Sequence, residues 1–343
     1  MLVLDIKRTK EDFLKKKGKS SEYTLNGYGV IFRHLEKFCQ SKYNSSLENL
    51  IQELAITENC QEQVENFLTS YIDELEAENK TSGSVRGYSC MTKNYLKYRR
   101  VKFDKDELEL SYKSNLKEEL YPITKKEIKA LMDHSNFEWK TKILMMSSGG
   151  FRISELLGVR KCDINRELER YSVYIRAEFA KGHKARTTLI SIEAMEYLDK
   201  LLENKNDNDL LFPHTTKIRT HAVVTNIILF QRTLKKAGLD MRYEGRNTHK
   251  ITTHSFRAFF ISQFEKTFSG FGHALSGHAR YLKQYERFTI GEKIEKYIET
   301  EKYLLIYSKP NESTKELSEL KAKVSRLEQV LSQKGINLNE LLK

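Results

Sequence analysis

Apolar residues recur at helical spacing through the first hundred residues, and this pattern restricts the fold of the chain most strongly. Three stretches, 22–39, 63–77 and 84–98, each repeat apolar and aromatic side chains every three or four positions. Such spacing places these side chains on one face of an amphipathic helix. The sequence therefore predicts a small helical domain over residues 1–110.

The next part of the chain mixes helical and strand patterns. A charged, weakly periodic stretch ends at Pro122, so we predict a linker over 111–122 and a second domain over 123–307. This domain opens on TKKE, Thr124 to Glu127, which has the form of a helix-capping box. Two β-rich runs, 171–177 and 186–192, predict a hairpin. The expected fold class is mainly α with a small antiparallel β-sheet, and helical periodicity returns after residue 193 and again over 279–305.

A last segment, 311–343, carries leucines and a valine at heptad spacing behind a second capping box, STKE. This pattern predicts a C-terminal amphipathic helix. Barely two heptads are too few to hold a coiled coil alone. The helix could cap its own chain or contact another subunit, and both alternatives stay open.

Composition limits the partners and the compartment. Lys and Arg exceed Asp and Glu by 59 to 47, a formal charge of +12, which favours a polyanionic partner. The four cysteines are far apart and lack metal-ligand spacing, so we expect reduced thiols and no metal site. No apolar run reaches the ~18 residues of a membrane helix, and no secretory signal is visible. A cytoplasmic protein without membrane contact is expected.

A series of polar residues with catalytic potential stands in well-defined local frames. The run GGFRISELL places an arginine after a Gly-Gly turn, and AKGHKAR places a lysine at the hairpin tip, where Lys184 is a competitor. The run THSFRAFF puts a histidine and an arginine three residues apart, on one helical face. The run SGHARYLKQYERF follows with a Gly-His pair and a tyrosine. The candidates are Arg152, Lys181, His254, Arg257, His278 and Tyr285.

In this order, the motifs G-x-R-x-x-E-L, K-G-x-K-x-R, H-x-x-R, G-H and Tyr resemble the tyrosine recombinase (phage integrase) family over about 123–307. The amino-terminal helices are similar to that family's core-binding domain. The run YLKQYERFT is similar to the family's archaeal-type branch. The resemblance implies DNA cutting and rejoining at a specific recombination site, by a tetramer on two duplexes, without a cofactor, a metal or ATP.

The resemblance also implies a role for each candidate. Tyr285 would attack the phosphate and form a 3′-phosphotyrosine bond. Arg152 and Arg257 would hold the phosphate oxygens, with Glu155 supporting the first arginine. Lys181 would protonate the leaving oxygen. His254 would accept the proton of the tyrosine, and His278 would donate a hydrogen bond to the phosphate.

Two questions stay open at this point. The pairing of His273 with Tyr281 is a second solution. The resemblance favours His278 with Tyr285, because the interval from Arg257 is 21 residues to His278 and 16 to His273, and the longer one is more similar to the spacing of the family. If His278 and Tyr285 are the site residues, we expect the first Gly-His pair, Gly272 and His273, to lie in a turn. A non-catalytic DNA-binding protein of the same fold and a type IB topoisomerase are the alternative functions.

Overall fold

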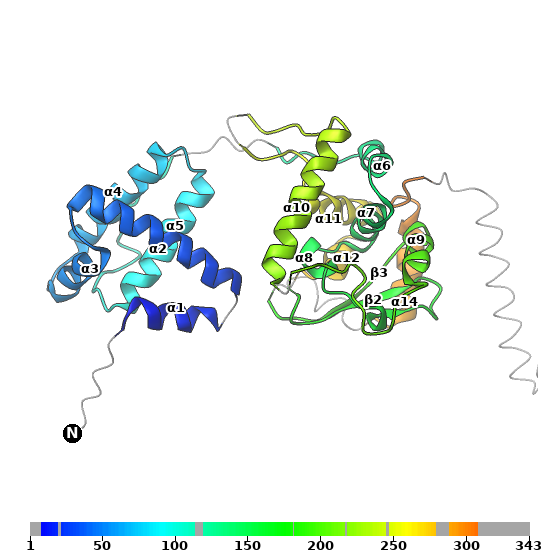
Figure 1. Cartoon of the computed structure of the whole chain (residues 1–343), viewed down its shortest axis with the longest axis horizontal. Coiled ribbons are helices and arrows are strands. Elements are labelled where there is room, and N and C mark those ends of the chain that lie inside the picture. The colour runs from blue at the N-terminus through cyan, green and yellow to red at the C-terminus, as the bar shows by residue number, and fades with distance from the viewer. Residues whose placement is uncertain are drawn as a thin grey trace, which may run out of the picture. The chain divides into compact units, whose positions relative to one another are not determined.

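The computed structural model describes residues 8–19, 22–113, 119–180, 182–216, 218–244, 247–278 and 288–307. Its contacts divide the chain into two compact units, Met1–Glu119 and Leu120–Lys343 (Figure 1). Within the described ranges, no helix is both long and apolar enough to cross a membrane. The four cysteines are free thiols.

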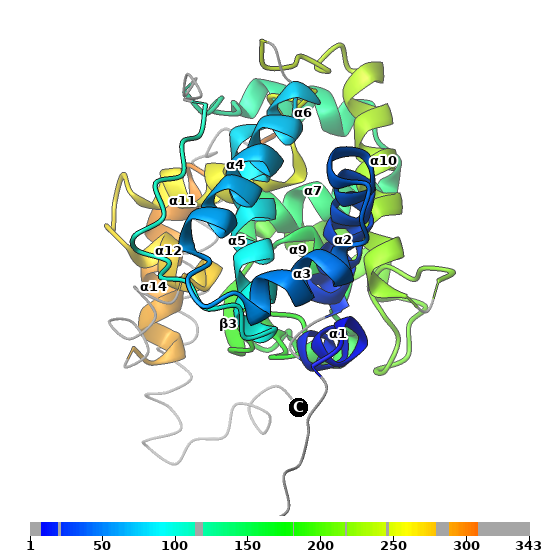
Figure 2. The ribbon, with the colours of Figure 1, turned by 90° about the vertical axis from the view of Figure 1, so that its left-hand side faces the viewer.

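The first unit is built from helices. Its described helices are α1 (Lys10–Gly18), α2 (Glu22–Tyr43), α3 (Leu47–Ile56), α4 (Gln61–Ala77) and α5 (Ser82–Tyr98). The three predicted amphipathic stretches correspond to α2, α4 and α5, and α4 and α5 pack side by side (Figure 2). The sequence analysis predicts neither of the two other helices, which are short, at 9 and 10 residues; α1 buries only Phe13, and α3 buries only Leu47 and Ile51.

The start of the charged stretch packs on the first unit. Leu108, Leu110 and Tyr112 contact its apolar core. The Tyr112 hydroxyl lies 3.0 Å from that of Ser89, which is fully buried in α5. The chain up to residue 113 is therefore anchored to the helices of the first unit.

The second unit is mainly α with one small sheet. Before the sheet come α6 (Lys125–Asp133), α7 (Phe137–Gly149), α8 (Ile153–Leu156) and the 3-10 turn η1 (Lys161–Asp163). The strands are β1 (Ile164–Asn165), β2 (Ser172–Ile175) and β3 (Arg186–Leu189). After them come α9 (Ile192–Leu202), α10 (Arg219–Lys236), α11 (Thr253–Phe264), α12 (Phe271–Ser276) and α14 (Ile290–Glu301). The predicted capping box at Thr124 and Glu127 is confirmed.

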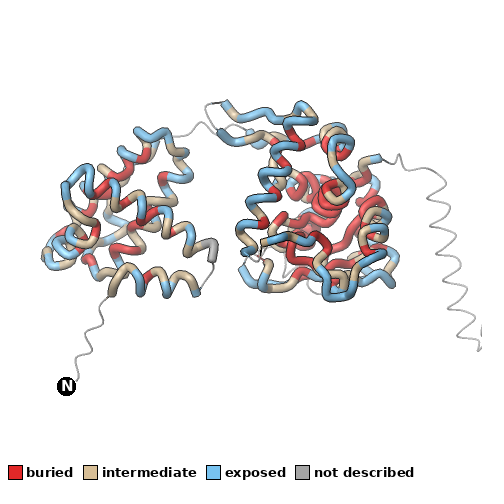
Figure 3. Tube along the Cα trace, in the orientation of Figure 1, coloured by how far each residue is buried: buried red, intermediate tan, exposed pale blue. Residues whose placement is uncertain are grey.

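Helix α7 forms the centre of the second unit. Its residues 141–149 are all buried, as part of the red interior of the second unit in Figure 3, and it packs against α6, α9 and α11. Its polar residues are compatible with burial because Ser147 and Ser148 donate to the carbonyls of Ile143 and Leu144, four residues back, at 2.8 and 2.7 Å. A helix that is buried all round leads directly to the Gly-Gly turn of the predicted site.

The sheet contains the predicted hairpin. The strand order is β1-β2-β3, all antiparallel, and Val173 pairs with Thr188 while Ile175 pairs with Arg186. Val173 and Ile175 are buried and Tyr174 is exposed, as the alternation predicts. The expected fold class is thus confirmed for the described residues.

Two expectations around residue 271 need correction. The first Gly-His pair does not lie in a turn but within α12. Gly272 serves packing instead, because a Cβ there would lie 2.8 Å from the Cβ of Phe264 in α11. The predicted helix over 279–305 is described only as α14, which begins after its N-cap Thr289, and the predicted segment 311–343 lies outside the described residues.

Candidate active site

The Gly-Gly turn fixes the position of Arg152. Gly150 ends α7 in the left-handed conformation, with φ of +65°. A Cβ at Gly150 would lie 2.5 Å from the ring of Phe260, so only glycine allows this approach. Two residues later Arg152 is the N-cap of α8, and its side chain is about one-fifth exposed (22%). Arg152 therefore stands at the edge of the core, just after the Gly-Gly turn.

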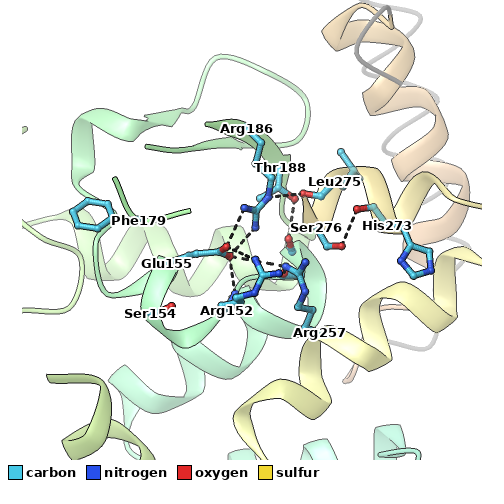
Figure 4. A network of polar contacts seen from close by, with 12 residues as sticks. Arg152, Ser154, Glu155, Phe179, Arg186, Thr188, Arg257, His273, Leu275 and Ser276 are labelled. Carbon is cyan, nitrogen blue, oxygen red and sulfur yellow. Dashed lines mark hydrogen bonds and ion pairs between the residues drawn. The ribbon is translucent and has the colours of Figure 1, made fainter. Parts of the chain in front are cut away.

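A fully buried carboxylate, Glu155, lies beneath Arg152. It accepts hydrogen bonds from Nη1 and the backbone N of Arg152 at 2.6 and 2.9 Å. It also accepts Nη1 and Nη2 of Arg186 at 3.1 and 2.7 Å (Figure 4). Burial pushes the pKa of Glu155 upward most strongly, but the arginines outweigh it and hold the pKa below its usual range. Glu155 is therefore a buried carboxylate that supports the arginines around it.

Arg186 connects three parts of the second unit. It begins β3, its two terminal nitrogens contact Glu155 of α8, and its Nε donates to the carbonyl oxygen of Leu275 in α12 at 3.0 Å. Its side chain is almost completely buried. Every nitrogen of this guanidinium thus has a protein partner.

The hydrogen bonds of Arg257, unlike those of Arg186, leave part of its guanidinium group open. It is completely buried in α11, where its Nη1 donates to the carbonyl oxygen of Gly150 at 2.7 Å and lies 3.9 Å from Oε2 of Glu155. Its Nε and Nη2 have no hydrogen-bond partner among the described residues. Burial, with a further contribution from the charge of Arg152, lowers the pKa of Arg257 to about 9. A buried guanidinium with two open nitrogens is unfavourable until a further acceptor completes it, and an anion is an acceptor that also matches its charge.

The end of α12 brings two histidines together. Gly277 adopts φ of +85°, the N–H of Gly277 bonds to the carbonyl of Ala274, and the N–H of His278 bonds to that of His273, both at 2.9 Å. This is the Schellman arrangement of a helix C-terminus. It leaves the Nδ1 atoms of His273 and His278 2.5 Å apart. Burial, and next the charge of Arg257, lower the pKa of His278 to about 4, so the ring is neutral at pH 7.

The remaining predicted residues are placed as follows. His254 lies in the first turn of α11 and is exposed, whereas Arg257, three residues on, is buried. The charge of His254 is one of the influences that lower the pKa of His278, so these two histidines lie within electrostatic range. The predicted Lys181 and Tyr285, and the alternative Tyr281, lie outside the described residues.

A tyrosine further along the chain belongs to the core. Tyr297 of α14 is completely buried and donates from its hydroxyl to the carbonyl oxygen of Ser148 at 2.8 Å. Burial raises its pKa well above the ordinary value. A hydroxyl held in this way is suited to packing and not to attack on a substrate.

The described groups form a strongly positive cluster. Figure 4 shows the guanidinium groups of Arg152 and Arg257 side by side on one side of the Glu155 carboxylate, with Arg186 on the other side. Three positive charges and one negative charge leave a net charge of +2. Among the described residues, no group of three or more His, Cys, Asp or Glu side chains could hold a metal ion. The arrangement can bind an anion through guanidinium donors.

Comparisons with known proteins agree with this picture. The model of the phage integrase family matches residues 122–267. No match was found among curated proteins. The chain is similar to the structure of the Tn1549 transposon integrase in complex with transposon right end DNA, at 14% identity and a TM-score of 0.53 over 84% of this chain and 96% of that chain. It is also similar to the XerH site-specific recombinase bound to palindromic difH substrate in a post-cleavage complex, at 18% identity and a TM-score of 0.51 over 80% and 78%.

These comparisons identify the fold of the second unit and a family domain within it. The fold of the second unit is that of tyrosine recombinase catalytic domains. Residues 122–267 form a phage integrase family domain within it.

The role of Arg186 was missed by the sequence analysis, although the residue is part of the motif K-G-x-K-x-R. One feature of the sequence indicates that Arg186 has a buried partner. Arg186 opens a β-rich run in which Thr188 also faces the interior, and a charged residue at an inward strand position requires a buried partner. The identity of that partner, Glu155, depends on a contact across 31 residues that no local pattern contains.

Proposed function

We propose that the chain is a site-specific DNA recombinase that cuts and rejoins double-stranded DNA through a 3′-phosphotyrosine intermediate at Tyr285. The observation that carries this proposal is the buried Arg257, with two open guanidinium nitrogens beside Arg152. The phage integrase family match and the recombinase fold support it.

The charge of the cluster suits a phosphodiester. A phosphodiester carries one negative charge, and a pentacovalent transition state gathers a second on its non-bridging oxygens. A cluster of net charge +2 therefore stabilises the transition state more than the substrate. The open Nε and Nη2 of Arg257 form one edge of a planar guanidinium, which is the geometry that two phosphate oxygens accept.

Arg152 and Arg257 together form a phosphate clamp, and the proposed reaction takes place on the phosphate that they hold. The phenol oxygen of Tyr285 forms a bond to phosphorus while the bond to the 5′ oxygen breaks. His254 takes the phenolic proton, and Lys181 gives a proton to the leaving oxygen, which departs as a 5′-hydroxyl. His278, neutral at pH 7, donates a hydrogen bond to the phosphate. A second 5′-hydroxyl reverses the steps, so neither ATP nor a metal is needed.

Further parts of the proposal concern assembly and context. The helical domain over 1–110 would hold the DNA as a core-binding domain, and four copies would act on two duplexes. The basic composition supports DNA as the partner. The run YLKQYERFT supports an archaeal-type branch of the family. The site of action is the cytoplasm.

A trapping experiment tests the proposal. The protein is incubated with nicked duplexes whose core sequence is randomised, so that cleavage releases a short 5′-hydroxyl strand and the covalent adduct persists. Wild type and the matched variant Y281F should give an adduct on a denaturing gel, and Y285F should give none. An adduct with Y285F would refute the assignment of the nucleophile, and DNA binding without any adduct would identify a non-catalytic protein. Relaxation of a supercoiled plasmid without strand exchange would identify a topoisomerase.

A further inference from the structure

We propose that Arg186 is a positioning residue that holds the carboxylate of Glu155 away from Arg257 and thereby keeps Arg257 open to an anion. This inference rests on the proposed function of the site. It assigns Arg186 no contact with the substrate.

The contacts of Arg186 exclude a direct role. Its Nε donates to Leu275 at 3.0 Å, and its Nη1 and Nη2 each contact one oxygen of Glu155. A Cβ at Gly277 would lie 2.8 Å from its Cδ and 3.0 Å from Nε and Nη1, so the α12 terminus closes over the side chain. Each nitrogen of this guanidinium is engaged and the side chain is enclosed, so it does not offer an open edge to a phosphate.

Both oxygens of the Glu155 carboxylate are occupied by hydrogen bonds from Arg152 and Arg186. Oε1 of Glu155 accepts Nη1 of Arg152 and Nη1 of Arg186, and Oε2 accepts Nη2 of Arg186 and the backbone N of Arg152. Two bonds to each oxygen satisfy the acceptor capacity of a carboxylate. Arg257 remains at 3.9 Å, beyond hydrogen-bond distance. The open donors of Arg257 thus depend on partners that occupy Glu155 elsewhere.

Loss of Arg186 would change the hydrogen bonding of Glu155. Two acceptor positions on a fully buried carboxylate would lose their donors, and buried acceptors without donors are unfavourable even though Arg152 stays bonded. The buried guanidinium of Arg257 lies 3.9 Å from Glu155 and has two nitrogens without a partner among the described residues. Glu155 would therefore pair with Arg257, and the net charge of the cluster would fall from +2 to +1. The carboxylate would occupy the place of the anion.

Four variants test this exchange by calorimetric titration with orthovanadate, a mimic of the pentacovalent phosphate. R257M should abolish binding because the clamp itself is lost. R186M should weaken binding by about tenfold or more, although Arg152 and Arg257 are intact. The double variant R186M/E155Q should recover to within about threefold of wild type, because a neutral amide forms no ion pair with Arg257 and the net charge returns to +2. R186K, which keeps the charge but not the fork, should fall between wild type and R186M.

A second measurement does not depend on any anion. In NMR spectra of protein labelled with 15N-arginine, the Nε–H of Arg257 should exchange more slowly with water in R186M than in wild type, and the double variant should reverse this change. Cooperative thermal unfolding of each variant establishes that it is folded.

The outcomes separate the inference from the proposed function. Unchanged vanadate affinity in R186M, or a loss that E155Q does not restore in a folded protein, would overturn the role of Arg186. Absence of vanadate binding to wild type would overturn the anion site, and the exchange rates of Arg257 would then decide the inference alone. Unaltered exchange in R186M would refute it.

Discussion

The side chain of Arg257 is fastened to the turn that carries Arg152, because its Nη1 donates to the carbonyl oxygen of Gly150 at 2.7 Å. This single bond joins residues that are 107 positions apart in the chain. It sets the spacing between the two arginines of the proposed clamp. The backbone of Gly150 is therefore as important to the site as the charged side chains.

Substitution of Gly150 should cost considerable stability. In G150A the new Cβ would meet the ring of Phe260 at 2.5 Å, and the residue would keep φ of +65°. Overpacking and backbone strain together should lower the free energy of unfolding by more than about 2 kcal/mol. The matched control is G238A, with φ of +67° and no atom within 4 Å of the new Cβ, which should cost only about 1 kcal/mol. Equal losses in urea denaturation would contradict the packing argument.

The anion affinity of the clamp should depend on the protonation of Arg257. Because burial and the charge of Arg152 lower its pKa to about 9, the guanidinium is charged below pH 9 and increasingly neutral above it. Affinity for sulfate, whose charge is constant over this range, should be steady from pH 7 to 8.5 and fall by about tenfold per unit well above pH 9. R257M, which loses the clamp, should not bind sulfate at any pH in this range. Constant wild-type affinity beyond pH 10 would contradict the account.

His278 should titrate far below an ordinary histidine. Burial, followed by the charge of Arg257, lowers its pKa to about 4, and its proton should be taken up near that pH in an NMR titration. The unfolded chain binds this proton at its ordinary pKa near 6.5, so the contribution of His278 to stability is present above pH 6.5 and is lost as pH falls toward 4. In R257M the midpoint should move upward. An unchanged midpoint would mean that the two side chains are not electrostatically coupled.

DNA binding should be strongly dependent on salt. A protein that contacts phosphates through Lys and Arg releases counterions, and the logarithm of its affinity falls with that of the salt concentration by about 0.9 per phosphate contact. The excess of basic residues in this chain leads us to expect a steep slope. Fluorescence anisotropy with a labelled duplex measures it. Affinity that does not change with salt would be incompatible with a phosphate clamp.

The sequence predicts those parts of the fold and site that depend on neighbouring residues. The capping box at Thr124, the hairpin strands and the exposure of Arg152 after Gly150 each arise from a few adjacent side chains. Periodicity likewise predicted α4, because its apolar face is regular over the whole helix.

Contacts between distant residues explain what the sequence does not reveal. The spacing H-x-x-R predicts a common helical side for His254 and Arg257 but not the depth of burial, which is set by α7 and the Gly150 carbonyl. The glycine at 272 was interpreted as part of a turn, whereas it permits close packing of α12 on α11. The partner of Arg186 is likewise fixed only in three dimensions.

The identity of the nucleophile is tested most directly by mass spectrometry of the trapped adduct. Trypsin cuts after Arg280, Lys283 and Arg287, so Tyr281 and Tyr285 fall on separate peptides, 281–283 and 284–287. After nuclease digestion of the bound DNA, the account predicts a nucleotide phosphate on peptide 284–287 alone. A nucleotide on peptide 281–283, or on a peptide from elsewhere in the chain, would contradict it.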